Sequence, residues 1–226
     1  MVTHARLLLL LAICSACKGR PPLPILNYHS VGPVADDYTV PEAAFAQQLD
    51  WLAAQGFHTA SLNQLVEHRL PPRPVILTFD DGKEDALTTV LPALRKRGMV
   101  GSFFVITSLI GQPGYLSWDD VRALAAAGME IGSHTVDHAR LADLPDDRVR
   151  AELMDSKREL EAHLQKPIEA LAYPYNSVRS RIIDAARAAG YRVAVSGPVH
   201  GGKELLNLYR ISVGGQTDIT RELPAH

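Results

Sequence analysis

Apolar residues along this chain form two kinds of pattern, short continuous runs and longer stretches with helical spacing. Short runs bounded by turn residues predict buried strands, whereas apolar residues spaced three or four apart predict helices. The predicted strands are 25–32, 75–79, 102–107, 129–132, 168–173, 191–195 and 208–213, and the predicted helices are 41–55, 61–68, 84–97, 117–128, 146–164 and 178–189. Pro92 is expected to interrupt its helix. This alternation favours a parallel sheet, either doubly wound or closed into a barrel, with function at the carboxyl ends of the strands.

The predicted strand 75–79 ends abruptly in two carboxylates and a glycine, Asp80, Asp81 and Gly82. Successive strand residues point to opposite faces of a sheet, so both carboxylates can serve one site only if the strand breaks at this point. Gly82 permits such a break because glycine adopts backbone conformations closed to other residues. Taken alone, the segment is also compatible with a solvated Asp-Asp-Gly turn.

Composition narrows the class of protein. The chain has 226 residues, 46% of them hydrophobic, which suits one domain of the larger α/β kind. Its formal net charge of -2 argues against nucleic acid as a partner and makes a neutral substrate the easier fit.

The first twenty residues have the pattern of an export signal. His4 and Arg6 precede an apolar run, residues 7–13, that is too short to span a bilayer. Both cysteines, Cys14 and Cys17, lie at the end of this segment, so the rest of the chain has no disulfide framework. Residues 13–17 resemble a bacterial lipoprotein cleavage box, in which a lipid on Cys17 would be the only membrane attachment. The alternative is ordinary signal cleavage near Ala16. Either way we expect an exported protein, periplasmic or anchored to a membrane as a lipoprotein.

Histidines that follow another predicted strand suggest a metal site. His134 and His138 are spaced i, i+4, which would place two imidazoles on one side of a helical turn. A carboxylate from the neighbouring strand 75–79 would complete three ligands and leave positions open for water and substrate, as in catalytic metal sites. Zinc is the default for this ligand set, and cobalt, nickel or iron(II) would also fit it.

Thr-Phe-Asp-Asp-Gly stands at 78–82 and Ser-His-Thr-x-x-His at 133–138. These two motifs resemble those of the NodB-type polysaccharide deacetylases (carbohydrate esterase family 4), metal-dependent enzymes that remove N-acetyl or O-acetyl groups from sugar polymers. The resemblance covers residues 25–213. It implies a single domain, 21–226, folded as a distorted (β/α) barrel with fewer than eight strands, and an N-acetylated polysaccharide as the substrate.

The same resemblance implies a role for each site residue. Asp80 would be the general base, and Asp81, His134 and His138 would hold the metal. The backbone amide of Tyr175, in the third motif, would help to bind the oxyanion.

Three departures from the usual family pattern affect the prediction. The third motif, Ala-Tyr-Pro-Tyr at 172–175, lacks the arginine that tunes the base, and Lys83 replaces an aromatic residue after the first motif. The usual histidine near the carboxyl terminus is absent, and His29, after the run 25–28, would supply the general acid instead. This arrangement, together with Tyr-Arg-Ile at 209–211, resembles the circularly permuted branch that includes the poly-N-acetylglucosamine deacetylases.

Two other classes of function fit parts of the pattern. Two histidines and a carboxylate also form the metal site of mononuclear iron oxygenases. A glycan-binding protein that has lost catalysis would be consistent with the missing arginine. The second aspartate, Asp80, argues against both, because neither a facial triad nor a pure binder needs it.

Overall fold

The centre of the fold is a parallel sheet. The structure is a computed structural model that describes residues 23–197 and 201–223. The strands are β1 (Ile25–Tyr28), β2 (Ser30–Gly32), β3 (Thr39–Pro41), β4 (His58–Ala60), β5 (Pro74–Phe79), β6 (Ser102–Val105), β7 (Glu130–Ser133), β8 (Ala170–Ala172), β9 (Val193–Ser196), β10 (Leu208–Tyr209) and β11 (Ile211–Ser212). Eight of them pair in the order β10-β9-β8-β7-β6-β5-β1-β11, and β4 pairs with the first half of β5. β2 and β3 form a separate pair.

The two edges of this sheet are consecutive in the sequence. β10 and β11 are separated by Arg210 alone, so the eight-strand sheet curls into a nearly closed, distorted (β/α)8 barrel. The prediction of fewer than eight strands is therefore wrong. The predicted strand 208–213 is two strands, because the chain leaves one edge at Tyr209 and joins the other at Ile211. The three-residue strand β4, which was not predicted, lies outside the eight-strand path. The predicted strand 25–32 is likewise divided at His29, because β2 leaves the barrel to pair with β3.

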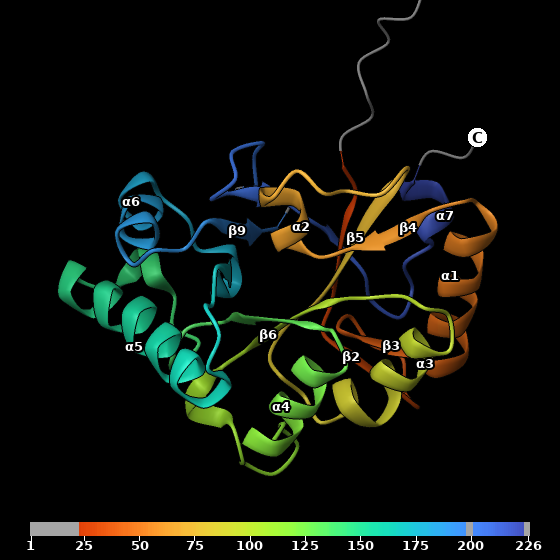
Figure 1. The fold of residues 1–226 in the computed structure, drawn as a ribbon, viewed down its shortest axis with the longest axis horizontal. Coiled ribbons are helices and arrows are strands. Elements are labelled where there is room, and N and C mark those ends of the chain that lie inside the picture. The colour runs from red at the N-terminus through yellow and green to blue at the C-terminus, as the bar shows by residue number, and fades with distance from the viewer. Residues whose placement is uncertain (1–22, 198–200, 224–226) are drawn as a thin grey trace, which may run out of the picture.

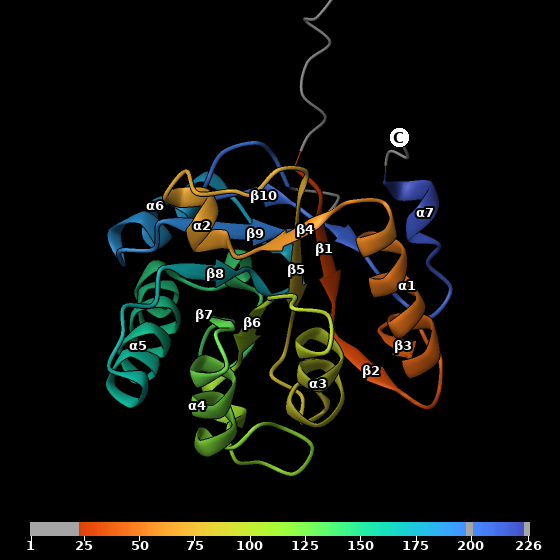
Figure 2. The ribbon, with the colours of Figure 1, turned by 45° about the vertical axis from the view of Figure 1, so that its right-hand side comes forward.

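Helices surround the barrel, and most match the predicted ranges. They are α1 (Glu42–Ala54), α2 (Leu62–Val66), α3 (Leu91–Arg95), α4 (Trp118–Ala126), α5 (Asp146–Leu164), α6 (Ser180–Ala188) and α7 (Ile219–Glu222). Figure 2 shows α1, α3, α4 and α5 in a row around the outside of the strands. Ser117 caps α4 through a reciprocal pair of hydrogen bonds with Asp120. Pro92 does not end the helix as expected: it lies in the first turn of α3, and the chain is distorted into a π-helical turn (Ala86–Val90) just before it but stays helical.

Strand residues alternate between two hydrophobic clusters. Leu77 and Phe79 of β5 belong to the large cluster that also holds the buried residues of the surrounding helices, such as Leu49. Ile76 belongs to a smaller cluster on the opposite face of the strands, together with Phe104. Because side chains alternate along a strand, Thr78 and Asp80 continue the face of Ile76. Asp80 is thereby directed into the barrel.

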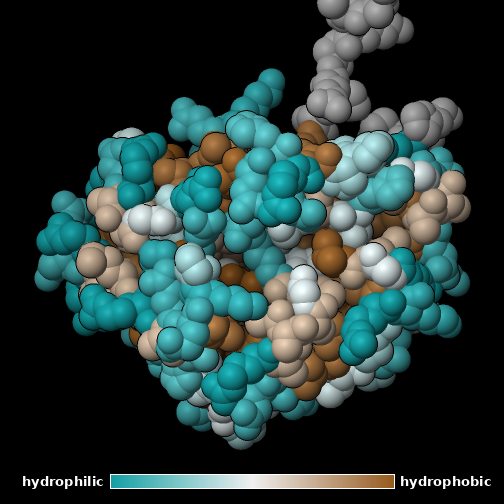
Figure 3. All heavy atoms as spheres, in the orientation of Figure 1, coloured by the Kyte–Doolittle hydropathy of each residue, from teal (hydrophilic) through white to brown (hydrophobic). Residues whose placement is uncertain are grey.

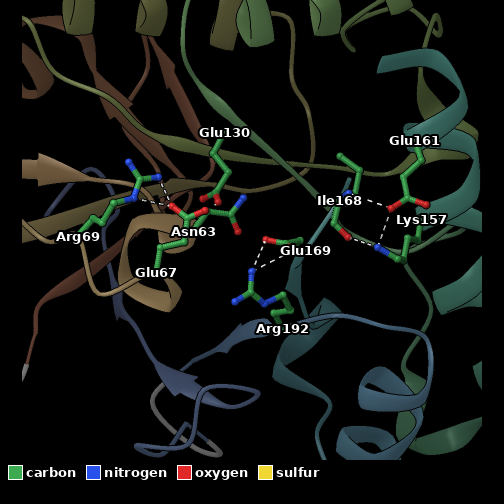
Figure 4. Close-up of polar contacts among 9 residues, drawn as sticks. All are labelled: Asn63, Glu67, Arg69, Glu130, Lys157, Glu161, Ile168, Glu169 and Arg192. Carbon is green, nitrogen blue, oxygen red and sulfur yellow. Dashed lines mark hydrogen bonds and ion pairs between the residues drawn. The ribbon is translucent and has the colours of Figure 1, made fainter. Parts of the chain in front are cut away.

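Polar contacts hold the amino-terminal ends of the strands (Figure 4). The Glu130 carboxylate, at the start of β7, accepts hydrogen bonds from the backbone amides of Leu62 and Asn63 at the start of α2 (2.9 and 2.8 Å). Arg192 donates to Glu169, which precedes β8 (3.1 Å). These contacts tie α2 and the strand ends together on the side opposite the carboxyl ends.

Figure 3 shows how polar and apolar residues are distributed on one face of the molecule. On the face shown in Figure 3, hydrophilic residues predominate and hydrophobic ones appear in separate patches. Within residues 23–197 and 201–223, no helix is both long and apolar enough to cross a bilayer. The predicted signal segment, 1–20, and the predicted lipid attachment at Cys17 lie outside the described residues.

Candidate metal centre and catalytic site

Asp80 and Asp81 follow β5, which lies between β1 and β6 in the sheet. β5 is labelled near the centre of Figure 1. The strand does break here, and the break begins one residue earlier than predicted. Asp81 itself has a left-handed backbone (φ 75°), as does Gly82 (φ 70°). A positive φ is uncommon for a residue other than glycine and cancels the strand alternation. Both carboxylates therefore face one site.

Asp81, His134 and His138 form a cluster of possible metal donors. One ligand atom from each residue lies within 4.8 Å of the other two. Asp81 Oδ1 is 3.6 Å from Nε2 of His134 and 3.6 Å from Nε2 of His138. Zinc bonds to nitrogen and oxygen are about 2.0–2.2 Å, so two ligands of one tetrahedral ion lie roughly 3.4 Å apart. The predicted donors thus fit a single divalent ion.

The two histidines converge through turns rather than a helix. Thr135 and His138 have φ of 68° and 56°, so the predicted helical turn is not formed. Nδ1 of His134 lies 2.8 Å from the carbonyl oxygen of Ala172, which places the ring proton there and leaves Nε2 free to bind a metal. Buried Glu152 of α5 accepts hydrogen bonds from the amides of Val136 and Asp137 (both 3.0 Å) and fixes the turn.

Arg210 is the partner of Asp80, and it takes the place of the arginine missing from the third motif. Its Nη1 and Nη2 donate to the two Asp80 carboxylate oxygens, both at 2.7 Å, and Nη1 also lies 3.1 Å from Thr78 Oγ1. Both side chains of the ion pair are buried. Burial alone would raise the pKa of Asp80, but the Arg210 guanidinium, together with the nearby His134 and His29, outweighs it and holds the pKa well below the ordinary value. Asp80 is therefore an ionised acceptor.

His29 and Tyr175 lie at opposite sides of this cluster. His29 directly follows β1, and burial lowers its pKa while Asp80 and Asp81 oppose that shift. Tyr175, in the turn after β8, has a left-handed backbone (φ 54°), and its ring centroid lies 4.5 Å from that of His138. The fold thus gathers all the predicted site residues, from segments after β1, β5, β7 and β8, at the carboxyl ends of the strands.

A three-donor metal site with an ion-paired carboxylate beside it, at the carboxyl ends of barrel strands, is typical of a metal-dependent hydrolase. Comparison with known proteins agrees with this class. The sequence model of the polysaccharide deacetylase family matches residues 67–194.

Individual relatives extend the match over most of the chain. YxkH of Bacillus subtilis, assigned by name to the polysaccharide deacetylases, is 30% identical over 199 residues, which are 84% of this chain and 71% of that protein. The poly-beta-1,6-N-acetyl-D-glucosamine N-deacetylase of Staphylococcus epidermidis is 26% identical over 198 residues (73% and 68%). The Streptococcus pyogenes deacetylase PplD, solved with acetate, has a TM-score of 0.78 at 27% identity (86% and 93%). The chain belongs to the polysaccharide deacetylase family, which favours hydrolysis over the iron-oxygenase alternative.

Proposed function

We propose that the protein removes N-acetyl groups from a polysaccharide of the cell envelope or extracellular matrix by hydrolysis. The observation that carries the proposal is the buried ion pair of Asp80 with Arg210, set beside the three metal donors. A structural carboxylate would not need to be held ionised at the edge of a metal site. O-acetyl groups present a similar carbonyl and are the alternative substrate.

The chain's own residues supply proton transfer and orientation. Asp80 takes a proton from the water that attacks the acetyl carbon, and the Tyr175 amide donates a hydrogen bond to the oxyanion that forms. His29 gives a proton to the sugar nitrogen as the carbon–nitrogen bond breaks, which releases acetate and a free amine. A divalent ion held by Asp81, His134 and His138 would polarise the carbonyl and lower the pKa of water.

The two aspartates divide these roles by their contacts. Asp81 Oδ1 is equidistant from both histidine Nε2 atoms, as expected of a third ligand. Asp80 Oδ2 lies 3.9 Å from His134 Nε2, and both of its oxygens already accept hydrogen bonds from Arg210. Asp80 is therefore better placed to act beside the ion than to bind it.

Release of acetate tests the proposal directly. The zinc-loaded protein is incubated with N-acetylglucosamine oligomers of β-1,4 and β-1,6 linkage, peptidoglycan and acetylated xylan, and acetate is measured. We expect release from at least one N-acetylated glycan, and elemental analysis should find one divalent ion per chain, with zinc as the default. A protein that binds these glycans yet releases no acetate with zinc, cobalt, nickel or iron would instead be a glycan-binding member of the family.

We further propose that the chain is exported, with Cys17 as its lipid attachment. The support is the pattern of the first twenty residues. Replacement Cys17→Ser should move the protein from the membrane fraction to the periplasm of the host, whereas an unchanged distribution would favour plain signal cleavage near Ala16.

A further inference from the structure

Tyr38 is a large aromatic residue that the core does not use. Its side chain is 63% exposed, and it belongs to neither hydrophobic cluster. Its ring nevertheless meets the ring of His29, with centroids 5.0 Å apart and planes at 75°. Tyr38 is therefore an exposed aromatic surface in contact with the histidine proposed as the general acid.

The backbone that carries Tyr38 is firmly held. Asp36 Oδ1 accepts hydrogen bonds from the amides of Tyr38 and Thr39 (2.8 and 2.6 Å), and the Tyr38 carbonyl accepts one from Ser30 (3.1 Å). The Asp36 carbonyl accepts another from Gly215, in the segment after β11 (2.8 Å). The loop between β2 and β3 thus presents Tyr38 in a fixed place before any ligand arrives.

Two glycines let the segment after β11 pack directly against this loop. A Cβ at Gly214 would lie 2.4 Å from the carbonyl oxygen of Asp37, and a Cβ at Gly215 would lie 2.7 Å from Cβ of Ala35. This close approach of the two backbones prevents the β2–β3 loop from moving toward the segment after β11. Specific backbone contacts therefore hold an exposed tyrosine beside the site, as is expected of a binding surface.

A second exposed tyrosine lies on the other side of the metal donors. Tyr175 is 52% exposed, and its ring contacts His138. The guanidinium of Arg140 lies 4.3 Å from the centre of the same ring. A hollow of about 260 Å³ opens here, lined by Tyr175, Arg140 and Asn176 among others. The site thus has an aromatic surface on the His29 side and another on the His138 side.

We propose that Tyr38 stacks on a sugar ring next to the acetylated unit, so that the preferred substrate is a chain with sugar units on both sides of that unit. The axial C–H groups of a pyranose form an apolar face that suits an exposed aromatic ring, and Tyr175 offers the matching surface across the site. Binding energy from this neighbouring sugar would fix the reacting acetamide between Asp80 and His29. The inference rests on the proposed deacetylase function.

Substrate length separates this role from a merely structural one. We would measure kcat and KM for N-acetylglucosamine and its oligomers up to the hexamer with the wild type, Tyr38→Ala, Tyr38→Phe and Val34→Ala. Val34 is the matched control, because it is 70% exposed on the same loop. We expect Tyr38→Ala to lower kcat/KM for the hexamer about tenfold, mainly through KM, and to change the single sugar, which has no neighbouring ring, less than twofold. Tyr38→Phe and Val34→Ala should match the wild type.

Two results would overturn the proposal. If Tyr38→Ala lowered kcat equally for every length, the ring would serve to orient His29 and not to bind sugar. If Tyr38→Ala had the wild-type kcat and KM for every substrate length, the ring would neither bind sugar nor orient His29. Calorimetric titration of the same oligomers into the full-length chain without metal separates this inference from the activity. Tyr38-dependent binding in that titration would uphold the stacking, and a zinc-loaded protein that released no acetate would reject the deacetylase alone.

Discussion

At the scale of single residues, the ion pair of Asp80 and Arg210 decides the character of the site. The two residues are 130 positions apart in the chain, yet both carboxylate oxygens and both Nη atoms are paired inside the barrel. Removing one member of a buried ion pair leaves the other charge uncompensated, which typically costs about 3–5 kcal/mol. Stability and activity at this site are therefore coupled.

Arg210→Met should show both effects. We expect the free energy of unfolding to fall by about 3–5 kcal/mol, measured by urea denaturation. Because Arg210 holds the pKa of Asp80 down and burial opposes it, loss of Arg210 should raise that pKa. The base must be ionised to act, so the acidic limb of the kcat/KM profile should move to higher pH. Arg122→Met, which removes an exposed ion pair with Asp119, is the control and should change neither quantity.

Asp80→Asn tests the base itself. The amide keeps the size of the side chain but cannot take a proton, so kcat/KM for acetate release should fall about 10²–10⁴-fold. Binding of N-acetylglucosamine oligomers should persist, which calorimetry would show. Asp119→Asn, at an exposed carboxylate, should retain full activity. Near-normal release of acetate by a folded Asp80→Asn protein would remove Asp80 from the mechanism.

At the scale of elements, the packing of β6 against β7 fixes the strand that delivers His134. A Cβ at Gly132 in β7 would lie 2.5 Å from the ring of Phe104 in β6 and 3.0 Å from the Ala170 carbonyl oxygen of β8. Phe104 is fully buried in the smaller cluster, so it has little space to move. Only glycine fits β7 at this position.

Gly132→Ala should therefore destabilise the protein by about 1–3 kcal/mol through overpacking, as measured by urea denaturation. Gly32→Ala is the matched control, because its Cβ would only reach ordinary contact with Thr39, at 3.5 Å. Its unfolding free energy should stay within about 0.5 kcal/mol of the wild type. Equal losses in both variants would mean that the Phe104 contact is not the cause.

At the scale of the whole molecule, the metal donors join two segments of the barrel rim. Asp81 follows β5, and His134 and His138 follow β7, with β6 between these strands in the sheet. An ion bound only to the folded arrangement stabilises it by mass action, by about 2.7 kcal/mol at a hundredfold excess over Kd. Metal binding should thus be visible as protein stability.

Zinc should accordingly raise the unfolding temperature of the chelator-treated wild type by roughly 5–10 °C, measured by calorimetry. His138→Ala removes one donor and should lose most of this shift, while its apo form unfolds near the temperature of the wild-type apo form. His58→Ala, at an exposed histidine bonded to the Pro72 carbonyl, should keep the full shift. A shift that survived in His138→Ala would place the ion elsewhere.

Local pattern by itself determined much of this protein. Continuous apolar runs located the strands that carry the site, helical spacing gave α1 and α5 almost to the residue, and the two motifs pointed to the family and to the candidate metal donors. These features depend on residues close together in the sequence, because burial of one face makes apolar residues recur every two residues in a strand and every 3.6 residues in a helix. The two adjacent carboxylates after 75–79 stood out because charged residues are unusual directly at the end of a buried apolar strand.

Only the tertiary structure decided how the barrel closes and what supports the site. Arg210 divides what looked like one strand, and no local pattern shows that its side chain would reach Asp80 from the other end of the chain. The left-handed turns at Asp81 and His138, the hydrogen bond of Glu152 to that second turn and the contact of Tyr38 with His29 likewise do not follow from the local pattern. Closure of the sheet brings its two edges together, so residues from motifs that are far apart in the sequence meet in one site.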